Sequence, residues 1–107
     1  MTKGLMQKID DASFASSTAK GAVLVDFFAV WCGPCRAMEP ALELLSTELQ
    51  GQVAFLQIDV DNAPKVTTQF QITSVPTLIL FKDGKEVHRI VGLKDHDTLK
   101  KIILQHA

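Results

Sequence analysis

The chain has 107 residues, of which 47% are hydrophobic and 21% charged, and its formal net charge is −1. These values are typical of a globular protein, and we expect residues 1–107 to form one domain around one core. Eleven basic and twelve acidic residues form no basic stripe, and no apolar run is long enough to span a bilayer. We therefore expect neither nucleic acid nor a membrane as a partner.

Strands and helices alternate along the first two thirds of the chain. Residues 23–30 are an almost continuous apolar run, typical of a strand covered on both faces. After Pro34, a favourable first residue of a helix, apolar side chains repeat at helical spacing up to Leu49. We expect a weak strand over residues 4–9, a helix over 12–18, a strand over 23–30, a helix over 34–49, a strand over 53–58 and a helix over 64–70.

The last third predicts a hairpin instead of another crossover. Residues 77–81 and 86–91 read as strands, and the segment Lys82-Asp83-Gly84-Lys85 between them carries an Asp-Gly turn signal. A final helix follows. The order β-α-β-α-β-α-β-β-α predicts an α/β fold, in which a mixed central sheet has helices on both sides.

Short polar side chains precede three of these helices and are candidate N-caps. They are Asp10 or Asp11 for the helix over 12–18, in which Phe14 is the buried anchor; Asp61 or Asn62 for the helix over 64–70; and Asp95 or Asp97 for the final helix, whose apolar face is Leu99, Ile102 and Ile103.

Both cysteines lie in one segment, Trp31-Cys32-Gly33-Pro34-Cys35. Two thiols separated by two residues can close a disulfide and reopen it, and so short a loop stabilises a fold by only about 2 kcal/mol. Such a bond suits redox chemistry better than structural reinforcement. An inert pair is one alternative and half of a zinc site is another. Zinc needs four N or S ligands, and His88, His96 and His106 lack paired-ligand spacing, so we expect no metal.

The N-terminal segment supports the redox interpretation. Met1 to Asp11 lacks the apolar run of a signal peptide, so we expect the protein in the cytoplasm. That compartment is reducing, and a cysteine pair there is more often catalytic than structural.

The two cysteines differ in position. Cys32 falls at the strand-to-helix junction, where free backbone N–H groups and the helix dipole favour a thiolate, so we expect it to be the nucleophile. Cys35 lies one turn further and is the expected resolving thiol. Gly33 lets a partner chain approach closely, and Pro34 starts the helix and stiffens the loop. Because neither intervening residue is charged, we expect an electron donor and not a strong oxidant.

Asp26 interrupts the apolar run that precedes the cysteines. Burial disfavours an ionised carboxylate, so a buried Asp26 has a raised pKa and can exchange a proton with Cys35 at the same strand end. The alternative is an edge-strand aspartate that faces water.

Three further positions are candidates for substrate binding. Val75-Pro76 is either the entry to a strand or a cis peptide that exposes the Val75 backbone to an extended substrate. Trp31 is either core or contact surface. Gly92 is either a loop glycine or a flat spot where a partner approaches.

The chain resembles the thioredoxin family over nearly its whole length. The residues that carry the resemblance are Asp26, Ala29, the segment Trp31-Cys32-Gly33-Pro34-Cys35, Pro40, Asp59 to Asp61, Val75-Pro76-Thr77, Phe81, Gly84 and Gly92. The resemblance implies a thioredoxin fold, with a central mixed sheet of five strands, four flanking helices and a cis Pro76.

The resemblance also implies a function. It is that of a monomeric protein-disulfide reductase, which holds no bound cofactor beyond the Cys32–Cys35 disulfide and is recharged by a thioredoxin reductase that uses NADPH. Two residues depart from the pattern: Phe28 stands where many bacterial relatives have tryptophan, and Gln57 where many have lysine.

A second function class remains open from the sequence. The same apolar surface would also serve a redox-independent binding subunit. The intact cysteine pair beside a candidate base argues against binding as the sole role.

Overall fold

The computed structural model describes residues 4–107. In chain order the elements are β1 (Gln7–Ile9), α1 (Phe14–Thr18), β2 (Ala22–Phe28), α2 (Gly33–Glu48), β3 (Ala54–Asp59), a 3-10 turn (Val60–Asn62), α3 (Pro64–Gln69), β4 (Thr77–Lys82), β5 (Lys85–Val91) and α4 (His96–His106). Apart from the 3-10 turn, this is the order expected from the sequence. None of the helices between residues 4 and 107 is long and apolar enough to cross a membrane.

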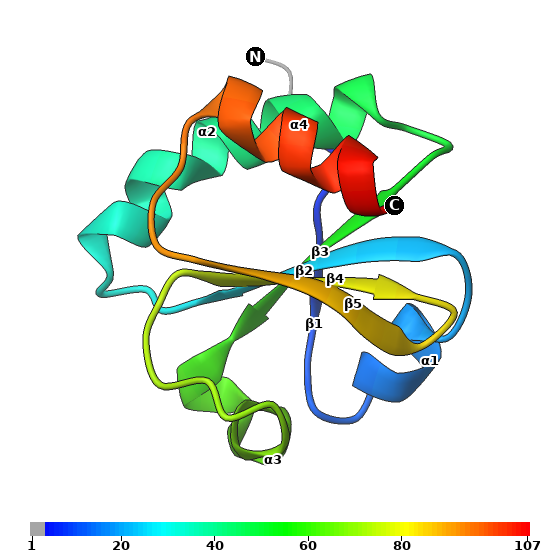
Figure 1. Cartoon of the computed structure of the whole chain (residues 1–107). Helices are drawn as coiled ribbons and strands as arrows, with labels where there is room; N and C mark the ends of the chain where they lie inside the picture. The colour runs from blue at the N-terminus through cyan, green and yellow to red at the C-terminus, as the bar shows by residue number, and fades with distance from the viewer. Residues whose placement is uncertain (1–3) are drawn as a thin grey trace.

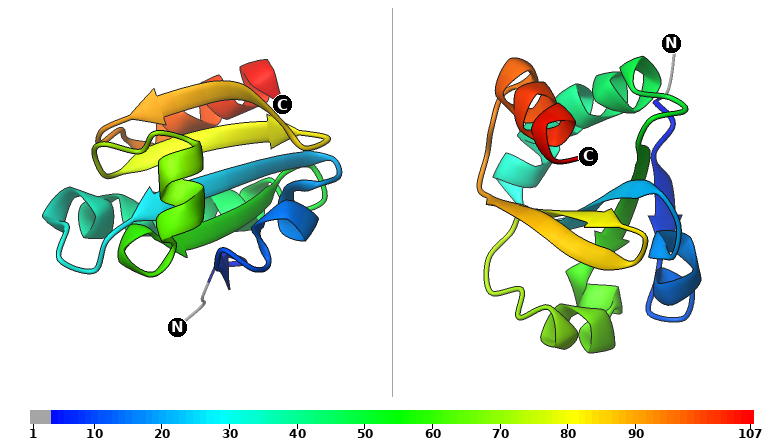
Figure 2. Two further views of the ribbon diagram at one scale, coloured as in Figure 1. Left: turned by 90° about the horizontal axis from the view of Figure 1, so that it is seen from below. Right: turned by 45° about the vertical axis from the view of Figure 1, so that its right-hand side comes forward.

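The five strands form one mixed sheet in the order β1-β3-β2-β4-β5. Strands β1, β3 and β2 run parallel to one another. Strand β4 is antiparallel to its neighbour β2, and β5 is antiparallel to its neighbour β4. Helices α2 and α4 cover one face of the sheet, and α1 and α3 cover the other (Figures 1 and 2). The expected architecture, a mixed five-stranded sheet with four helices, is confirmed.

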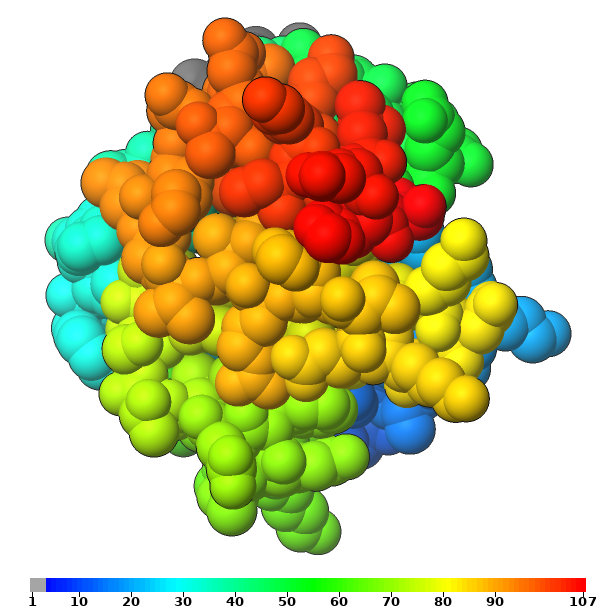
Figure 3. Space-filling model, in the orientation of Figure 1, coloured from blue at the N-terminus to red at the C-terminus, as the bar shows by residue number. Residues whose placement is uncertain are grey.

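The core has one layer on each face of the sheet, because successive residues of a strand point to opposite faces. Leu24 packs with α2 and α4, whereas Val23, Val25 and Phe27 pack with α1 and α3. This is why β2 is apolar at nearly every position. In the space-filling view, side chains of α4 and β5 fill the front of the molecule, where the ribbons alone leave a gap (Figure 3).

The hairpin forms as predicted, and two strands are shorter than predicted. Asp83 and Gly84 make the turn with positive φ angles of 50° and 85°, a backbone region that favours glycine. Strand β2 ends at Phe28 because the Ala29 carbonyl accepts the Cys32 N–H at 3.1 Å, which begins the turn to α2. Strand β1 covers only Gln7–Ile9.

Two of the expected N-caps are wrong. Helix α1 begins after Ser13, and Asp10 binds the N–H and hydroxyl of that serine in the turn before it. Asp11 instead accepts the N–H groups of Lys65 and Val66, at 3.1 and 2.9 Å, so it caps α3 on the same face of the sheet.

The residue before α3 is Ala63, which has no side-chain acceptor, and neither Asp61 nor Asn62 caps the helix. The third expected cap is correct: Asp95 accepts the Thr98 N–H at 2.9 Å and caps α4.

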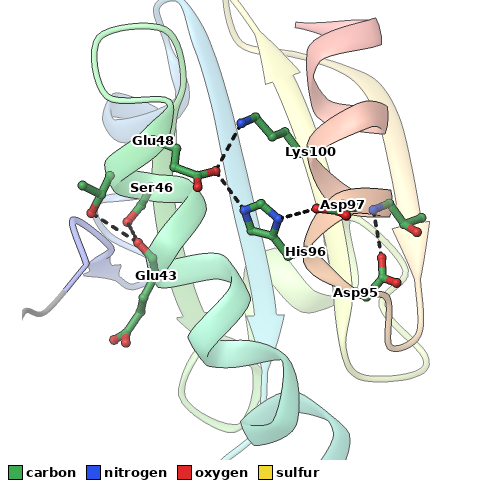
Figure 4. Close-up of polar contacts among 9 residues, drawn as sticks. Glu43, Ser46, Glu48, Asp95, His96, Asp97 and Lys100 are labelled. Carbon is green, nitrogen blue, oxygen red and sulfur yellow. Dashed lines mark hydrogen bonds and ion pairs between the residues drawn. The ribbon is translucent and has the colours of Figure 1, made fainter.

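A polar cluster joins the end of α2 to the start of α4 (Figure 4). The His96 ring lies between two carboxylates, with Nε2 at 2.8 Å from Glu48 and Nδ1 at 2.9 Å from Asp97. Lys100 adds a contact of 3.4 Å to the same Glu48 oxygen. We call these four residues the α2–α4 clamp.

Candidate functional site

The two cysteines form a disulfide at the start of α2. Cys32 is the N-cap residue, with extended backbone, and Pro34 occupies the first turn. The Cys32 Sγ accepts the backbone N–H of Cys35 at 3.1 Å. Sulfur therefore takes the place that a serine or aspartate oxygen usually fills at a helix N-terminus.

The disulfide lies just beneath an exposed surface. Each cysteine is 4% exposed, whereas Gly33 and Pro34 are exposed. The half-buried Phe28 packs against the cysteines and also lines the pocket next to Cys35. A partner that reaches the sulfur atoms must pass over the exposed residues of the loop.

The Val75-Pro76 segment lies beside Cys32. The peptide bond is cis, and the Val75 carbonyl oxygen is 3.8 Å from the Cys32 Sγ. Gly92 donates its N–H to the Pro76 carbonyl at 2.9 Å and has a φ of 94°. The structure thus brings Val75, Pro76 and Gly92 together next to the sulfur, although Pro76 itself is buried.

Trp31 belongs to the surface and not to the core. Its side chain is 67% exposed, and its indole N–H donates to Asp61 at 2.8 Å. A pocket of about 140 Å³ lies against it, lined also by Val60, Ile72, Thr73, Ser74 and Val75.

Sequence reasoning missed some of this surface. The sequence suggests Asp61 as a helix cap and gives no sign that it contacts Trp31, because the two residues are 30 positions apart. The apolar side chains of Val30, Val91 and Leu93 are also more than half exposed. Each lies within two residues of Trp31 or Gly92 in the sequence. Val30 and Val91 sit in or beside apolar strand sequences, so no local signal distinguishes them from core residues.

Asp26 is buried, and the water-facing alternative is wrong. Its side chain is 2% exposed, and Oδ1 has no hydrogen-bond partner among the described residues. Burial raises the pKa of Asp26 to about 7; the Gln57 side chain opposes this rise, and the negative charge of Glu39 adds to it. A carboxyl with such a pKa can accept or donate a proton near neutral pH.

Asp26 and Cys35 face the same pocket. It has a volume of about 290 Å³ and is lined by Lys8, Asp26, Phe28, Ala29, Val30, Cys35, Arg36, Glu39 and Gln57. A thiol and a carboxyl that share a pocket open to solvent can exchange a proton directly or through water. Cys32, by contrast, adjoins the Val75 carbonyl.

The histidines form no metal site in the described part of the chain. No group of three or more His, Cys, Asp or Glu residues there is placed to hold a metal ion. His88 stacks on His106, with ring centroids 3.9 Å apart, and His96 belongs to the α2–α4 clamp.

Comparison with known proteins agrees with this geometry. A thioredoxin family model matches residues 5–105. The chain is 52% identical over 102 residues to thioredoxin of Chlamydia trachomatis and 54% identical over 102 residues to that of Chlamydia muridarum, covering 95% of this chain and 99% of each relative. It is 40% identical over 99 residues to thioredoxin of Staphylococcus aureus, covering 92% of this chain and 95% of that protein.

Disulfide substrates and a reductase are the partners of this family in general. The family match spans both the Cys32–Cys35 disulfide and the sheet that carries it. The chain therefore belongs to the thioredoxin family, and it is a thiol–disulfide oxidoreductase whose redox-active group is the Cys32–Cys35 disulfide.

Proposed function

We propose that the protein reduces protein disulfides in two exchange steps. In the first, the Cys32 thiolate attacks one substrate sulfur; the substrate S–S bond breaks, a mixed disulfide forms, and the leaving thiolate takes up a proton. In the second, the Cys35 thiolate attacks the Cys32 Sγ, closes the Cys32–Cys35 disulfide and releases the second substrate thiol. The substrate gains two electrons and two protons, and the protein ends oxidised.

The observation that carries this proposal is the sulfur cap on α2. Cys32 Sγ already receives the Cys35 N–H and lies at the positive end of a sixteen-residue helix. Both features stabilise a thiolate at position 32 and make it the attacking group. Cys35 is turned toward the pocket that it shares with Asp26, as a resolving thiol requires.

Asp26 is the proposed proton acceptor for Cys35. Its orphaned Oδ1 and its pKa of about 7 support a carboxyl that changes protonation state at neutral pH. In the second step the Cys35 proton passes to the Asp26 carboxylate, directly or through one water molecule, and later returns to solvent through the pocket.

The substrate-binding surface proposed here surrounds Cys32. Its members are Trp31, Gly33, Pro34, Val75, Pro76 and Gly92. An extended substrate segment can pair with the Val75 backbone, whose carbonyl lies beside the Cys32 sulfur. Trp31 and the pocket next to it offer apolar contact area.

The finer partners are also proposals. A thioredoxin reductase that draws on NADPH restores the dithiol, so nicotinamide acts only through that enzyme. We propose that the chain works as a monomer in the cytoplasm, with residues 1–107 as one domain. The match of the family over residues 5–105 supports the single domain.

Disulfide reduction by the wild type, Cys32→Ser and Cys35→Ser tests the cysteine roles. We expect Cys32→Ser to be inactive and Cys35→Ser to accumulate a mixed disulfide, which mass spectrometry detects as a covalent adduct. Adducts on Cys35 in Cys32→Ser, at the wild-type rate, would reverse the roles. Activity equal to wild type in both variants would favour the redox-independent binding subunit, which the intact disulfide argues against.

A further inference from the structure

Lys8, Gln57 and Asp26 form one row across the sheet. Lys8 is the register partner of Gln57, and Gln57 is the register partner of Asp26. Register partners on neighbouring strands point to the same face of a sheet. That face is the one beneath α2 and α4, because the residues two positions earlier all pack in that core layer: Phe55 on β3, Leu24 on β2, and Met6 just before β1.

Burial increases along the row from its edge inwards. Lys8 is exposed on the edge strand, Gln57 is 8% exposed and Asp26 is 2% exposed. Neighbouring strands lie about 4.8 Å apart, so the backbones of Lys8 and Asp26 are separated by about 10 Å. A lysine side chain can cross much of that distance, and the Gln57 amide between them offers both an acceptor and a donor.

The three residues also line one pocket together with Cys35. The charged groups on the opposite wall are Arg36 and Glu39, both from α2, and β4 contributes the apolar Leu78 as the other register partner of Asp26. Lys8 is therefore the cation that shares a row with the buried acid, whereas Arg36 faces it from a different element.

We propose that Lys8 is a positioning residue for Asp26 and acts through Gln57. The Lys8 ammonium donates to the Gln57 side-chain carbonyl, which turns the Gln57 amide N–H toward the orphaned Asp26 oxygen. This arrangement holds the carboxylate ready to take the Cys35 proton in the second exchange step. The inference rests on the proton-transfer role proposed above for Asp26.

NMR titration of the Asp26 carboxyl tests the proposal. The disulfide form is used because neither cysteine then titrates with the acid. We expect Lys8→Gln to move the Asp26 midpoint upward by about 0.5 pH unit, as loss of one cation at this range predicts, and Lys8→Arg to restore most of it. Lys20→Gln is the control: it also removes one positive charge, but before the N-terminal end of β2, and it should leave the midpoint unchanged.

Two further variants test the route. In a Gln57→Leu background, Lys8→Gln should shift the midpoint much less, because the connecting amide is gone. An Asp26 midpoint that is unchanged in Lys8→Gln would overturn the proposal. A larger shift in Arg36→Gln than in Lys8→Gln would also overturn it, by assigning the effect to α2.

The pH dependence of mixed-disulfide release separates this inference from the proposed function. We expect Lys8→Gln to shift that profile to higher pH, by the same amount as the Asp26 midpoint. If Asp26→Asn leaves release unaffected, the role of Asp26 fails. If Asp26→Asn slows release and Lys8→Gln leaves both the profile and the midpoint in place, only the role of Lys8 fails.

Discussion

The backbone N–H of Cys35 donates a hydrogen bond of 3.1 Å to the Cys32 sulfur. The backbone of the second cysteine therefore stabilises negative charge on the sulfur of the first. After reduction this N–H can still stabilise a negative sulfur at position 32. Within residues 4–107 no backbone N–H donates to the Cys35 sulfur, and Cys35 lines the Asp26 pocket instead. The motif is therefore electrostatically asymmetric.

Cys32 should be alkylated before Cys35 in the reduced protein. The thiolate is the reactive species, and the N-terminus of α2 stabilises it at position 32. Limiting iodoacetamide at pH 7 followed by peptide mass spectrometry measures the ratio of the two products. Preferential labelling of Cys35 would contradict the assignment.

Asp26→Asn should stabilise the protein in a pH-dependent way. The folded pKa of about 7 lies above the ordinary value of 3.8, so the buried carboxylate lowers the free energy of unfolding once pH exceeds 3.8. The cost grows until about pH 7 and reaches at most about 4 kcal/mol. The cost of burying the new amide reduces the net gain.

Urea unfolding of the wild type and Asp26→Asn, followed by far-UV circular dichroism between pH 3 and pH 9, measures this difference. The two curves of stability against pH should diverge from about pH 4 to pH 7 and then run parallel. Curves that stay parallel over the whole range would show that Asp26 titrates alike in the folded and unfolded states.

Two replacements of Gln57 should shift the pKa of Asp26 in opposite directions. In Gln57→Lys an ammonium next to the carboxyl favours the ionised form and lowers the pKa of Asp26. In Gln57→Leu the opposing influence of the amide disappears, so the pKa rises above its wild-type value. Carboxyl NMR titration follows both variants. Shifts of the same sign in both would indicate a change of packing instead of charge.

The His96 contacts of the α2–α4 clamp should stabilise the protein most below neutral pH, and this pH-dependent stabilisation should be lost above it. The hydrogen bonds to Asp97 and Glu48 raise the pKa of His96 above 6.5. A raised histidine pKa means that the contribution is complete below pH 6.5 and disappears as pH rises through the folded pKa. The gap in unfolding free energy between the wild type and His96→Gln should close accordingly.

Glu48→Gln provides the matched control for the clamp, because it removes one carboxylate and leaves the ring in place. It should reproduce part of the same pH dependence. An equal gap at pH 5 and pH 9 for His96→Gln would mean that the ring stabilises by packing alone.

Asp11→Ala should lower the free energy of unfolding by about 1 kcal/mol, the usual cost of a lost helix cap. The Asp11 carboxylate accepts two N–H groups at the start of α3. Asp11→Asn keeps one acceptor oxygen and should lose less. Asn62→Ala, which removes no α3 cap, serves as the control. Equal stability of Asp11→Ala and wild type in urea would contradict the cap.

The strands and helices could be predicted because their signals are local. Strand β2 is apolar at almost every position because both faces of the sheet are covered, and the Asp-Gly turn needs only its own backbone angles. The contact between Asp11 and Val66 spans 55 residues, and it depends on how the loop after β1 packs against α3. No local pattern contains that information.

The same distinction holds for the site. The cysteine pair and Asp26 are visible in the sequence because each departs from its surroundings. The pairing of Trp31 with Asp61 depends on tertiary packing, and the row from Lys8 to Asp26 depends on the register of the edge strand. Nothing in the sequence around Lys8 indicates that it lies in the same row as Asp26, two strands away.

Trp31 is the chain's single tryptophan, and the chain contains no tyrosine. Because its side chain is 67% exposed beside the disulfide, the ultraviolet emission of the protein reports on the active-site loop and hardly on the core. A docked substrate or a broken bond to Asp61 should change the spectrum directly. Unfolding should change it far less than it would change the emission of a buried indole, so fluorescence and circular dichroism measure different events in this protein.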